Sequence, residues 1–289
     1  MSDRPYPESL AEIEKWRLGR NITSEEARKR FVQYVVLDLI ASADWADQVA
    51  FKGGNALRFG YGSPRSTVDL DFTAAPDFPD DASTIRSLLD SALSRGLHRH
   101  LVRARCQSIR RNPRSPQATH PTYDISVAYQ LPGDRQYESF DQAVGIKTVI
   151  RLEISLNDVV CEFIPQKLSA GAAHTLRVCS LEDILAEKLR ALLQQPIRNC
   201  SRPQDVYDIA RIYCEDRGHL DLTKISRFLL RKAESRNIPV ARSAFDQGVR
   251  RRASQEYGHL FEAQDPDQIP FDDAWLLVLE LVRRLDIPD

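Results

Sequence analysis

Residues 51–73, FKGGNALRFGYGSPRSTVDLDFT, decide the fold and carry the chain's densest chemistry. An apolar lead-in is followed by a double glycine that opens a short helix, a Gly/Pro/Ser turn, and a strand with two carboxylates. Side chains alternate along a strand, so Asp69 and Asp71 are expected on one face, with Val68, Leu70 and Phe72 on the other. The two like charges repel each other, and a divalent cation with oxygen ligands offsets that repulsion.

The glycines just before this strand indicate a phosphate site. Gly53 and Gly54 let the backbone approach a ligand closely, and the helix that follows offers free N–H groups at its start. Either feature alone is usually just a turn or a solvated strand face. Together, at this spacing, a phosphate cradle and a carboxylate pair are typical of phosphoryl or nucleotidyl transfer.

The composition bounds the size and charge of the protein. At 289 residues the chain is long enough for one large domain or two modest ones, and its net charge of −1 predicts no partner. The charge is unevenly distributed, however. Residues 91–123 hold seven arginines and no acidic residue, and residues 224–252 hold nine Lys/Arg against two acids. Such segments can follow a phosphate backbone, or can be solvated or paired with acidic helices; both interpretations stay open.

The cysteines and the N-terminus indicate the compartment. The five cysteines are scattered without a C-x-x-C pair, which favours reduced thiols and argues against a structural zinc site. The first residues form no apolar signal core, and no apolar run approaches membrane-spanning length. We therefore expect a cytoplasmic protein with no membrane partner.

Hydrophobic periodicity predicts an α+β fold. The domain at 1–176 is expected to pack helices on one face of a mixed sheet. Its helices are predicted over 10–16, 23–43 and 83–93, and its strands over 49–51, 68–72, 101–109, 123–130, 144–156 and 159–163. In the strand over 101–109, Cys106 and Ser108 would share one face, and Arg103 and Arg105 the other.

The remaining domain, 177–289, is predicted to be entirely helical. Its helices are expected over 180–194, 203–216, 221–234, 240–256 and 272–285. In the first of these helices Lys188 lies in the middle of an apolar stripe, where an ammonium must reach water or be held by a buried acid or a phosphate. Asp205 and Asp208 open the second helix, where helix capping is an alternative role for Asp205.

A third carboxylate is expected from a strand next to Asp69 and Asp71. Glu153 and Glu162 are both candidates, and we favour Glu153 because Arg151-Leu152-Glu153 forms a basic-x-acidic pair on a strand. A strand glutamate on a half-solvated face is the alternative interpretation.

Four motifs resemble those of the AbiEii/AbiGii-type toxins, which belong to the DNA polymerase-β-like nucleotidyltransferase superfamily. KGGNAL with RSTVDLD resembles the first motif, and Arg151-Leu152-Glu153 is similar to the second. LAEKLRA, which contains Lys188, resembles the third. QDVYD at 204–208 resembles the fourth, but has Gln204 where arginine is usual, with Arg202 two positions upstream. The resemblance spans about residues 48–215.

The resemblance implies roles for particular residues. The implied catalytic residues are Asp69, Asp71, Glu153, Lys188 and Asp208, with the last two contributed by the helical domain. The implied ligands of Mg²⁺ (or Mn²⁺) are Asp69, Asp71 and Glu153. The implied nucleotide-binding residues are Lys52, Gly53, Gly54, Asn55, Arg65, Ser66 and Asp205.

The resemblance also implies a function. We expect a Mg²⁺-dependent nucleotidyltransferase, the toxin of a bacterial toxin–antitoxin or phage-defence pair, that transfers NMP from NTP to an RNA 3′ end, with tRNA as acceptor and a cognate antitoxin as partner. The charge distribution assigns RNA contacts to Arg103, Arg105, Arg110 and Arg111. The alternatives are transfer of NMP or phosphate to a protein partner, and a nucleotide-binding regulator that is not an enzyme. Two intact aspartates favour activity.

Overall fold

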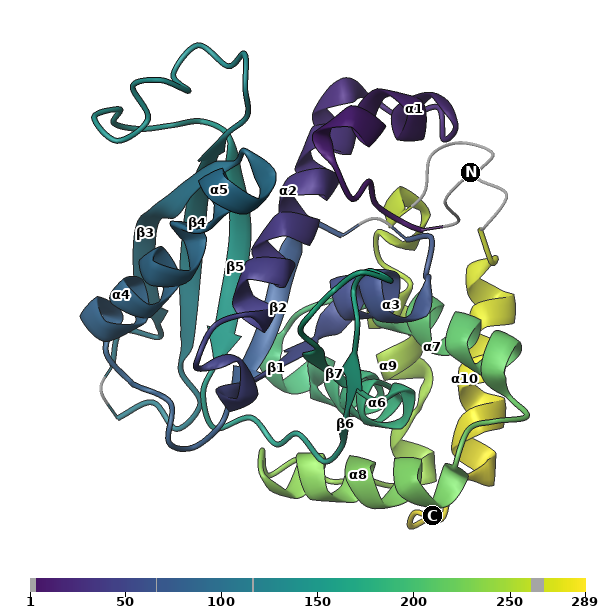
Figure 1. The fold of residues 1–289 in the computed structure, drawn as a ribbon. Coiled ribbons are helices and arrows are strands. Elements are labelled where there is room, and N and C mark those ends of the chain that lie inside the picture. Colours follow the sequence, from purple (N-terminus) through teal and green to yellow (C-terminus); the bar gives the residue numbers. More distant parts are fainter. Residues whose placement is uncertain (1–3, 66, 116, 261–267) are drawn as a thin grey trace. The chain divides into compact units, whose positions relative to one another are not determined.

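The computed structural model describes residues 4–65, 67–115, 117–260 and 268–289 (Figure 1). The chain divides into two compact units. The first comprises Met1–Asp158 and Ile164–Val178, and the second comprises Val159–Phe163 and Cys179–Asp289. The predicted boundary at 176/177 thus falls beside the division after Val178.

A seven-stranded sheet has the order β3-β4-β5-β2-β1-β7-β6. β2 runs parallel to β5, and β1 runs parallel to β7, whereas the β1–β2, β3–β4 and β4–β5 pairs are antiparallel. The sheet is therefore mixed, and the predicted α+β class is confirmed. The strand bounds are β1 Val49–Lys52, β2 Asp69–Ala74, β3 Arg103–Asn112, β4 Thr122–Gln130, β5 Val149–Ser155, β6 Phe163–Gln166 and β7 Leu176–Cys179.

Helices cover one face of β3, β4 and β5 in the first unit (Figure 1). Buried residues such as Leu70, Ile125 and Leu152 point to this face from three neighbouring strands. We call the opposite side of β2, β5, β4 and β3, which carries Asp69 and Asp71, the open face. The α-helices of this unit are α1 Ile13–Leu18, α2 Ser24–Ala41, α3 Gly53–Tyr61, α4 Ala82–Leu93 and α5 Gly96–His100. The 3-10 helix η1 Leu10–Glu12 precedes α1, and the 3-10 helix η2 Ala46–Gln48 lies between α2 and β1.

One end of the open face is covered by residues 131–148. Ala128, Phe140 and Ile146 form a buried apolar cluster there. The predicted strand over 144–156 therefore begins only at Val149. The physical reason is that the Gln107 side chain binds both the N–H and the C=O of Ile146, at 2.9 and 3.1 Å, in place of a neighbouring strand.

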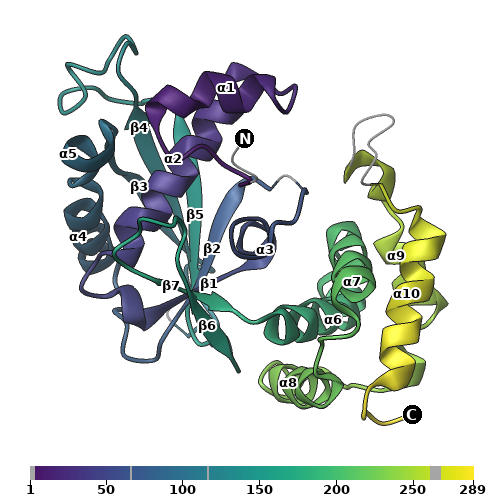
Figure 2. The ribbon, with the colours of Figure 1, turned by 45° about the vertical axis from the view of Figure 1, so that its right-hand side comes forward.

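The second unit contains five α-helices among its described residues (Figure 2). The prediction of one helix over 240–256 was wrong, because Asp246 caps a new helix there by accepting from the N–H groups of Gly248 and Val249. The bounds are α6 Leu181–Arg198, α7 Pro203–Asp216, α8 Leu222–Glu234, α9 Gln247–Ala253 and α10 Phe271–Arg284, with 3-10 helices η3 Arg242–Ala244 and η4 Tyr257–Leu260.

The predicted strand over 159–163 was also wrong. Side chains of the helical unit hold this segment instead of a neighbouring strand: Lys232 donates to the Val159 carbonyl, and Asp183 accepts from the Cys161 N–H at 2.7 Å. Among the described residues, no helix is both long and apolar enough to cross a membrane.

Candidate functional site

β2 places two carboxylates on the open face. Leu70 and Phe72 are buried, whereas Asp69 and Asp71 are partly exposed, which is the alternation that the sequence predicts. Val68 departs from the prediction, because β2 begins only at Asp69 and Val68 is 50% exposed.

The register of the sheet brings other charges beside these carboxylates. Asp71 lies opposite Glu153 of β5, and Asp69 lies opposite Arg151. Glu153 in turn lies opposite Asp124 of β4. Since neighbouring strands are about 4.8 Å apart, three carboxylates form a row across three adjacent strands. The sequence pattern did not single out Asp124, because the register of β4 cannot be seen in it.

The two glycines approach their neighbours more closely than any other residue could. Gly53 has a φ of +75°, and a Cβ atom there would overlap the Asp71 carboxylate. A Cβ atom on Gly54 would overlap Thr67 and would lie 2.5 Å from the Arg65 guanidinium. The double glycine therefore seats the start of α3 directly against an acid and a base.

The chemistry of this group fits a hard divalent cation. Asp69 Oδ1 is buried and has no hydrogen-bond partner among the described residues, so an oxygen donor is left over. In the described ranges no three His, Cys, Asp or Glu side chains form a metal-binding group by themselves. Mg²⁺ usually takes one or two protein carboxylates and completes its shell with water and substrate phosphates, and Asp69 with Asp71 suits that mode.

Four buried polar side chains hold the segment that leads into β2. They come from α2 and α3, are each less than 9% exposed, and bind backbone carbonyls. The bonds are Arg30 to Thr67 (3.1 Å), Gln33 to Val68 (3.1 Å), Asn55 to Asp69 (2.6 Å) and Arg58 to Pro64 (2.7 Å). We call Arg30, Gln33, Asn55 and Arg58 the buried polar layer. It satisfies the carbonyls of an irregular segment and so fixes where Asp69 begins the strand.

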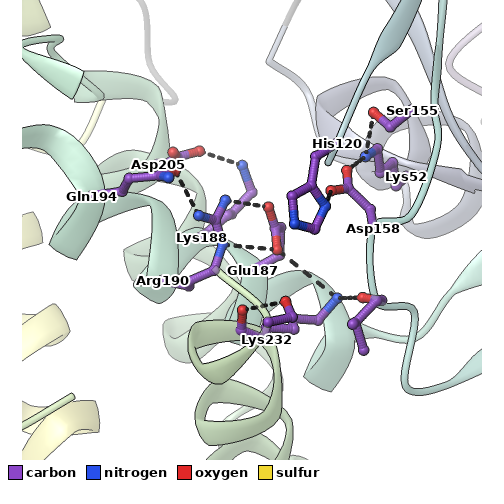
Figure 3. A network of polar contacts seen from close by, with 12 residues as sticks. Lys52, His120, Ser155, Asp158, Glu187, Lys188, Arg190, Gln194, Asp205 and Lys232 are labelled. Atoms are coloured by element: carbon purple, nitrogen blue, oxygen red, sulfur yellow. Dashed lines mark hydrogen bonds and ion pairs between the residues drawn. The ribbon is translucent and has the colours of Figure 1, made fainter. Parts of the chain in front are cut away.

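Lys52 reaches over the open face from the end of β1. Its Nζ donates to Ser155 Oγ at 3.0 Å and pairs with Asp158 Oδ2 at 2.8 Å (Figure 3). His120 Nδ1 lies 3.8 Å from the other Asp158 oxygen. A strand serine and a loop aspartate thus hold the ammonium beside the carboxylate row. The sequence could not indicate these two partners, because they lie far from Lys52 along the chain.

The electrostatics of the row act most clearly on Glu153. Burial raises the pKa of Glu153; the charge of Lys52 lowers it, and that of Asp124 raises it. The net pKa shift is upward, which makes this carboxylate a better proton acceptor near neutral pH than an exposed glutamate.

Lys29 of α2 is a further cation that the sequence did not indicate. The pKa of Lys29 is lowered, first by burial and then by the neighbouring charge of Arg30. The charge of Asp69 raises this pKa, and that of Arg151 lowers it. An ammonium close to Asp69 therefore adds to the positive charge at the start of β2.

In the helical unit, Lys188 is bound by two acids. Its Nζ lies 2.8 Å from Asp205 Oδ1 and 2.7 Å from Asp208 Oδ2. Figure 3 draws the contact between Lys188 and Asp205. The three residues are 6%, 5% and 2% exposed. Of the alternatives that the sequence left open for Lys188, the structure has a lysine held by buried acids. Asp205 is therefore more than a helix cap.

The second candidate for a third carboxylate lies in different surroundings. Glu162 is outside any strand, belongs to the second unit, and accepts from Lys224 at 2.7 Å. This hydrogen bond lowers the pKa of Glu162. Glu153, on the strand next to β2, remains our candidate.

Three of the four arginines expected to contact RNA have local partners. Arg103 pairs with Asp141 and stacks on Tyr137, and Arg105 donates to carbonyls of the covering segment 131–148. Arg111 pairs with Asp80 at 3.1 Å. Arg110 is exposed on β3. The predicted nucleotide-binding residue Ser66 lies outside the described residues.

Comparison with known proteins gives a family match. The family model described as "Nucleotidyl transferase AbiEii toxin, Type IV TA system" matches residues 35–276. No curated protein matches the chain.

Solved structures give a matching fold. A putative nucleotidyltransferase from H. pylori has a TM-score of 0.53 and 14% identity, over 91% of this chain and 95% of that one. MenT4, a nucleotidyltransferase toxin from Mycobacterium tuberculosis H37Rv, has a TM-score of 0.48 and 17% identity, over 96% and 90% of the two chains. The first of these structures supports the fold alone.

Proposed function

The chain belongs to the AbiEii family of nucleotidyltransferase toxins, and from that premise we propose that it transfers NMP from an NTP to the 3′ end of an RNA, with tRNA as acceptor. The resemblance seen in the sequence is thereby confirmed at the level of the family and of the enzyme class. The acceptor, the metal and the individual site residues are our proposals.

The cross-strand row on the open face carries this proposal. Asp69 and Asp71 share a strand face, Glu153 lies opposite Asp71, and Gly53 brings the start of a helix against Asp71. We assign Asp69 and Asp71 to a divalent cation, Mg²⁺ or Mn²⁺, and propose that Glu153 joins them as a third ligand once the cation is bound. When bound, the cation would neutralise charge on the triphosphate and lower the pKa of the attacking hydroxyl.

The residues around Gly53 are proposed to seat the NTP. The N–H groups at the start of α3, from Gly53 and Gly54 onward, suit phosphate oxygens, and the Arg65 guanidinium beside Gly54 suits their charge. Asn55 is fully buried and donates to Asp69, which favours an indirect contribution through the segment it holds. The contacts of Lys52 likewise favour a role beside Glu153.

The proposed reaction is a displacement at the α-phosphorus. The acceptor 3′-oxygen forms a bond to that phosphorus, the bond to the oxygen that bridges to the β-phosphate breaks, and pyrophosphate leaves. We assign the proton of the attacking hydroxyl to Glu153, which lies opposite Asp71 in the row. The residues contribute mainly by positioning and by electrostatics.

The helical unit supplies the other proposed residues. Lys188, with Asp205 and Asp208, is a buried and fully bonded group, so its ammonium is held in one place. We propose that Lys188 and Asp208 are needed for catalysis, and that Asp205 serves nucleotide binding by holding Lys188. The family's type IV toxin–antitoxin description implies an antitoxin partner.

Incubation of the purified protein with Mg²⁺, each labelled NTP in turn, and total cellular RNA tests the proposal. We expect label at RNA 3′ ends with wild type and none with Asp71→Asn. Label on protein in a cell extract, with none on RNA, would replace the RNA acceptor with a protein. No transfer from any NTP to either acceptor would overturn the proposal.

A further inference from the structure

Strand β3 contains a β-bulge that changes the direction of its side chains. The register with β4 shifts between Cys106 and Ser108, so Gln107 is an extra residue. Arg105 lies opposite Ala128 before the bulge, and Ser108 lies opposite Ser126 after it. In a regular strand Arg105 and Arg110 would point to opposite faces, because side chains alternate. The bulge brings both to the open face.

The bulge thereby adds Arg110 to the carboxylate row. Arg110 lies opposite Asp124, and the row then reads Asp71, Glu153, Asp124, Arg110 across β2, β5, β4 and β3. Ser108, which alternation alone would place beside Cys106, belongs to the open face as well.

Arg110 and Arg151 are the exposed arginines on this part of the open face. Arg151 lies beside Asp69, and Arg110 lies at the far end of the row. Neither makes a hydrogen bond or an ion pair with another described residue. Arg103 and Arg105, by contrast, lie under residues 131–148, and Arg111 is paired with Asp80.

We propose that the single-stranded 3′ end of the acceptor RNA crosses the open face from β2 toward β3, with its backbone phosphates on Arg151 and Arg110. This inference rests on the proposed function and names the path of its acceptor. Guanidinium groups bind phosphates strongly and with defined geometry, and the two here are exposed and locally unused.

The length of the path and the charges along it are suited to a few nucleotides of single-stranded RNA. Three strand spacings separate β2 from β3, so the path is about 14 Å long. Asp124 would repel a passing phosphate, but Arg110 lies directly opposite it, and an opposite charge across a strand pair offsets that repulsion. An extended single strand fits an open sheet surface better than a duplex does, because the terminal hydroxyl must reach Asp69 and Asp71.

Arg110 and Arg111 form a matched pair for the test, because Arg111, which the sequence also assigned to RNA, is paired with Asp80 and lies outside the proposed path. They are neighbours in sequence but point to opposite faces of β3. Binding of a single-stranded RNA oligonucleotide is measured for wild type, Arg110→Ala, Arg151→Ala and Arg111→Ala over a range of salt concentrations. We expect the first two variants to weaken binding at least about threefold at low salt, and each to lower the salt slope by about 0.7.

Two controls separate the path from the chemistry. Arg110→Lys keeps the charge and should keep most of the salt slope. ATP and GTP binding to Arg110→Ala should equal that of wild type. Arg111→Ala should bind RNA within about twofold of wild type.

Equal RNA affinity of Arg110→Ala and Arg111→Ala would overturn the path. If wild type still labels RNA in the transfer assay, the proposed function stands and only the path is wrong. If wild type neither labels nor binds RNA at low salt, the proposed function fails together with the path, and a protein acceptor becomes the better reading.

Discussion

Two groups of charged residues in this protein are built in opposite ways. On the open face, Asp69 retains an oxygen without a hydrogen-bond partner among the described residues, and Asp124 and Arg151 are exposed. In the helical unit, Lys188 is buried and bound to Asp205 and Asp208 at 2.8 and 2.7 Å. The first group is suited to a charged ligand, whereas the second already has its opposite charges.

This difference separates the energetic roles of the two groups. Like charges gathered on a sheet face cost stability, and a cation or a substrate offsets that cost only when it binds. A buried ion pair is neutral or weakly stabilising while intact, but removing one partner is strongly destabilising. Substitutions on the open face should therefore affect activity, and those at Lys188 should affect both activity and stability.

The largest effect is expected from Asp71→Asn. Loss of a proposed metal carboxylate should lower kcat/KM by at least about 1000-fold, while urea unfolding shows that the variant remains folded. Asp124→Asn is the comparison, since it lies in the same row but outside the proposed ligands and should act only through the charge it places beside Glu153. If Asp71→Asn keeps activity within about threefold of wild type and is folded, the metal assignment is wrong.

Lys188→Met should show the second largest effect. The sequence alone predicted that stability would hold or rise if no buried acid were left unpaired. The structure leaves Asp205 and Asp208 buried without their cation, so we expect a loss of about 3–5 kcal/mol in urea unfolding, and a collapse of activity.

A compensated variant separates the stability of the Lys188, Asp205 and Asp208 group from its proposed role in activity. Lys188→Met with Asp205→Asn and Asp208→Asn removes the unpaired charges and should recover much of the stability. Activity should stay absent. Recovered activity in this triple variant would make Lys188 purely structural, which would remove the helical unit from our catalytic assignment.

The sequence was sufficient wherever a pattern is local. Alternation alone placed Asp69 and Asp71 on one face of β2, and the helical stripe alone marked Lys188 as an ammonium that must reach water or be held by an acid or a phosphate; the structure has the acids. These predictions depend only on the geometry of one strand or one helix.

Features that depend on register or on distant partners were not predicted. Asp124 joins the row only through the β4–β5 register, and Arg110 only through an extra residue at Gln107. The strand predicted over 144–156 extended into the covering segment 131–148, because the hydrogen bonds between Gln107 and Ile146 join positions far apart in sequence and leave no local signal. Strand β7, with four residues, is too short for a periodic signal.

A smaller effect is expected at the buried polar layer, where Gln33→Met tests whether position matters on the open face. Methionine keeps the length of the side chain but removes the donor to the Val68 carbonyl. The substitution also removes an acceptor from the buried Arg30 guanidinium, and the groups left unsatisfied should cost about 1–3 kcal/mol of stability.

Because Val68 directly precedes Asp69, kcat should fall in Gln33→Met more than NTP affinity does. Mg²⁺ titrations of activity, with thermal unfolding at each Mg²⁺ concentration, measure both. Unchanged kcat in a destabilised Gln33→Met protein would mean that the layer supports the fold without positioning the carboxylates.

The smallest effect is expected from Glu162→Gln, and it sharpens the choice of the third carboxylate. Glu162 is partly exposed and pairs with Lys224, so the substitution should change the midpoint of thermal unfolding only slightly. The lowered pKa of Glu162 fixes the sign of the pH effect: its contribution to stability is present above the unfolded-state pKa and is lost as the pH falls through the folded-state pKa. The stabilities of wild type and Glu162→Gln should therefore differ at neutral pH and converge in acid.

Transfer activity of Glu162→Gln should stay within about twofold of wild type. Glu153→Gln removes both a proposed ligand and the proton acceptor and should nearly abolish transfer. If Glu162→Gln is inactive and Glu153→Gln is active, the third carboxylate comes from the second unit, and the row on the open face does not carry the chemistry.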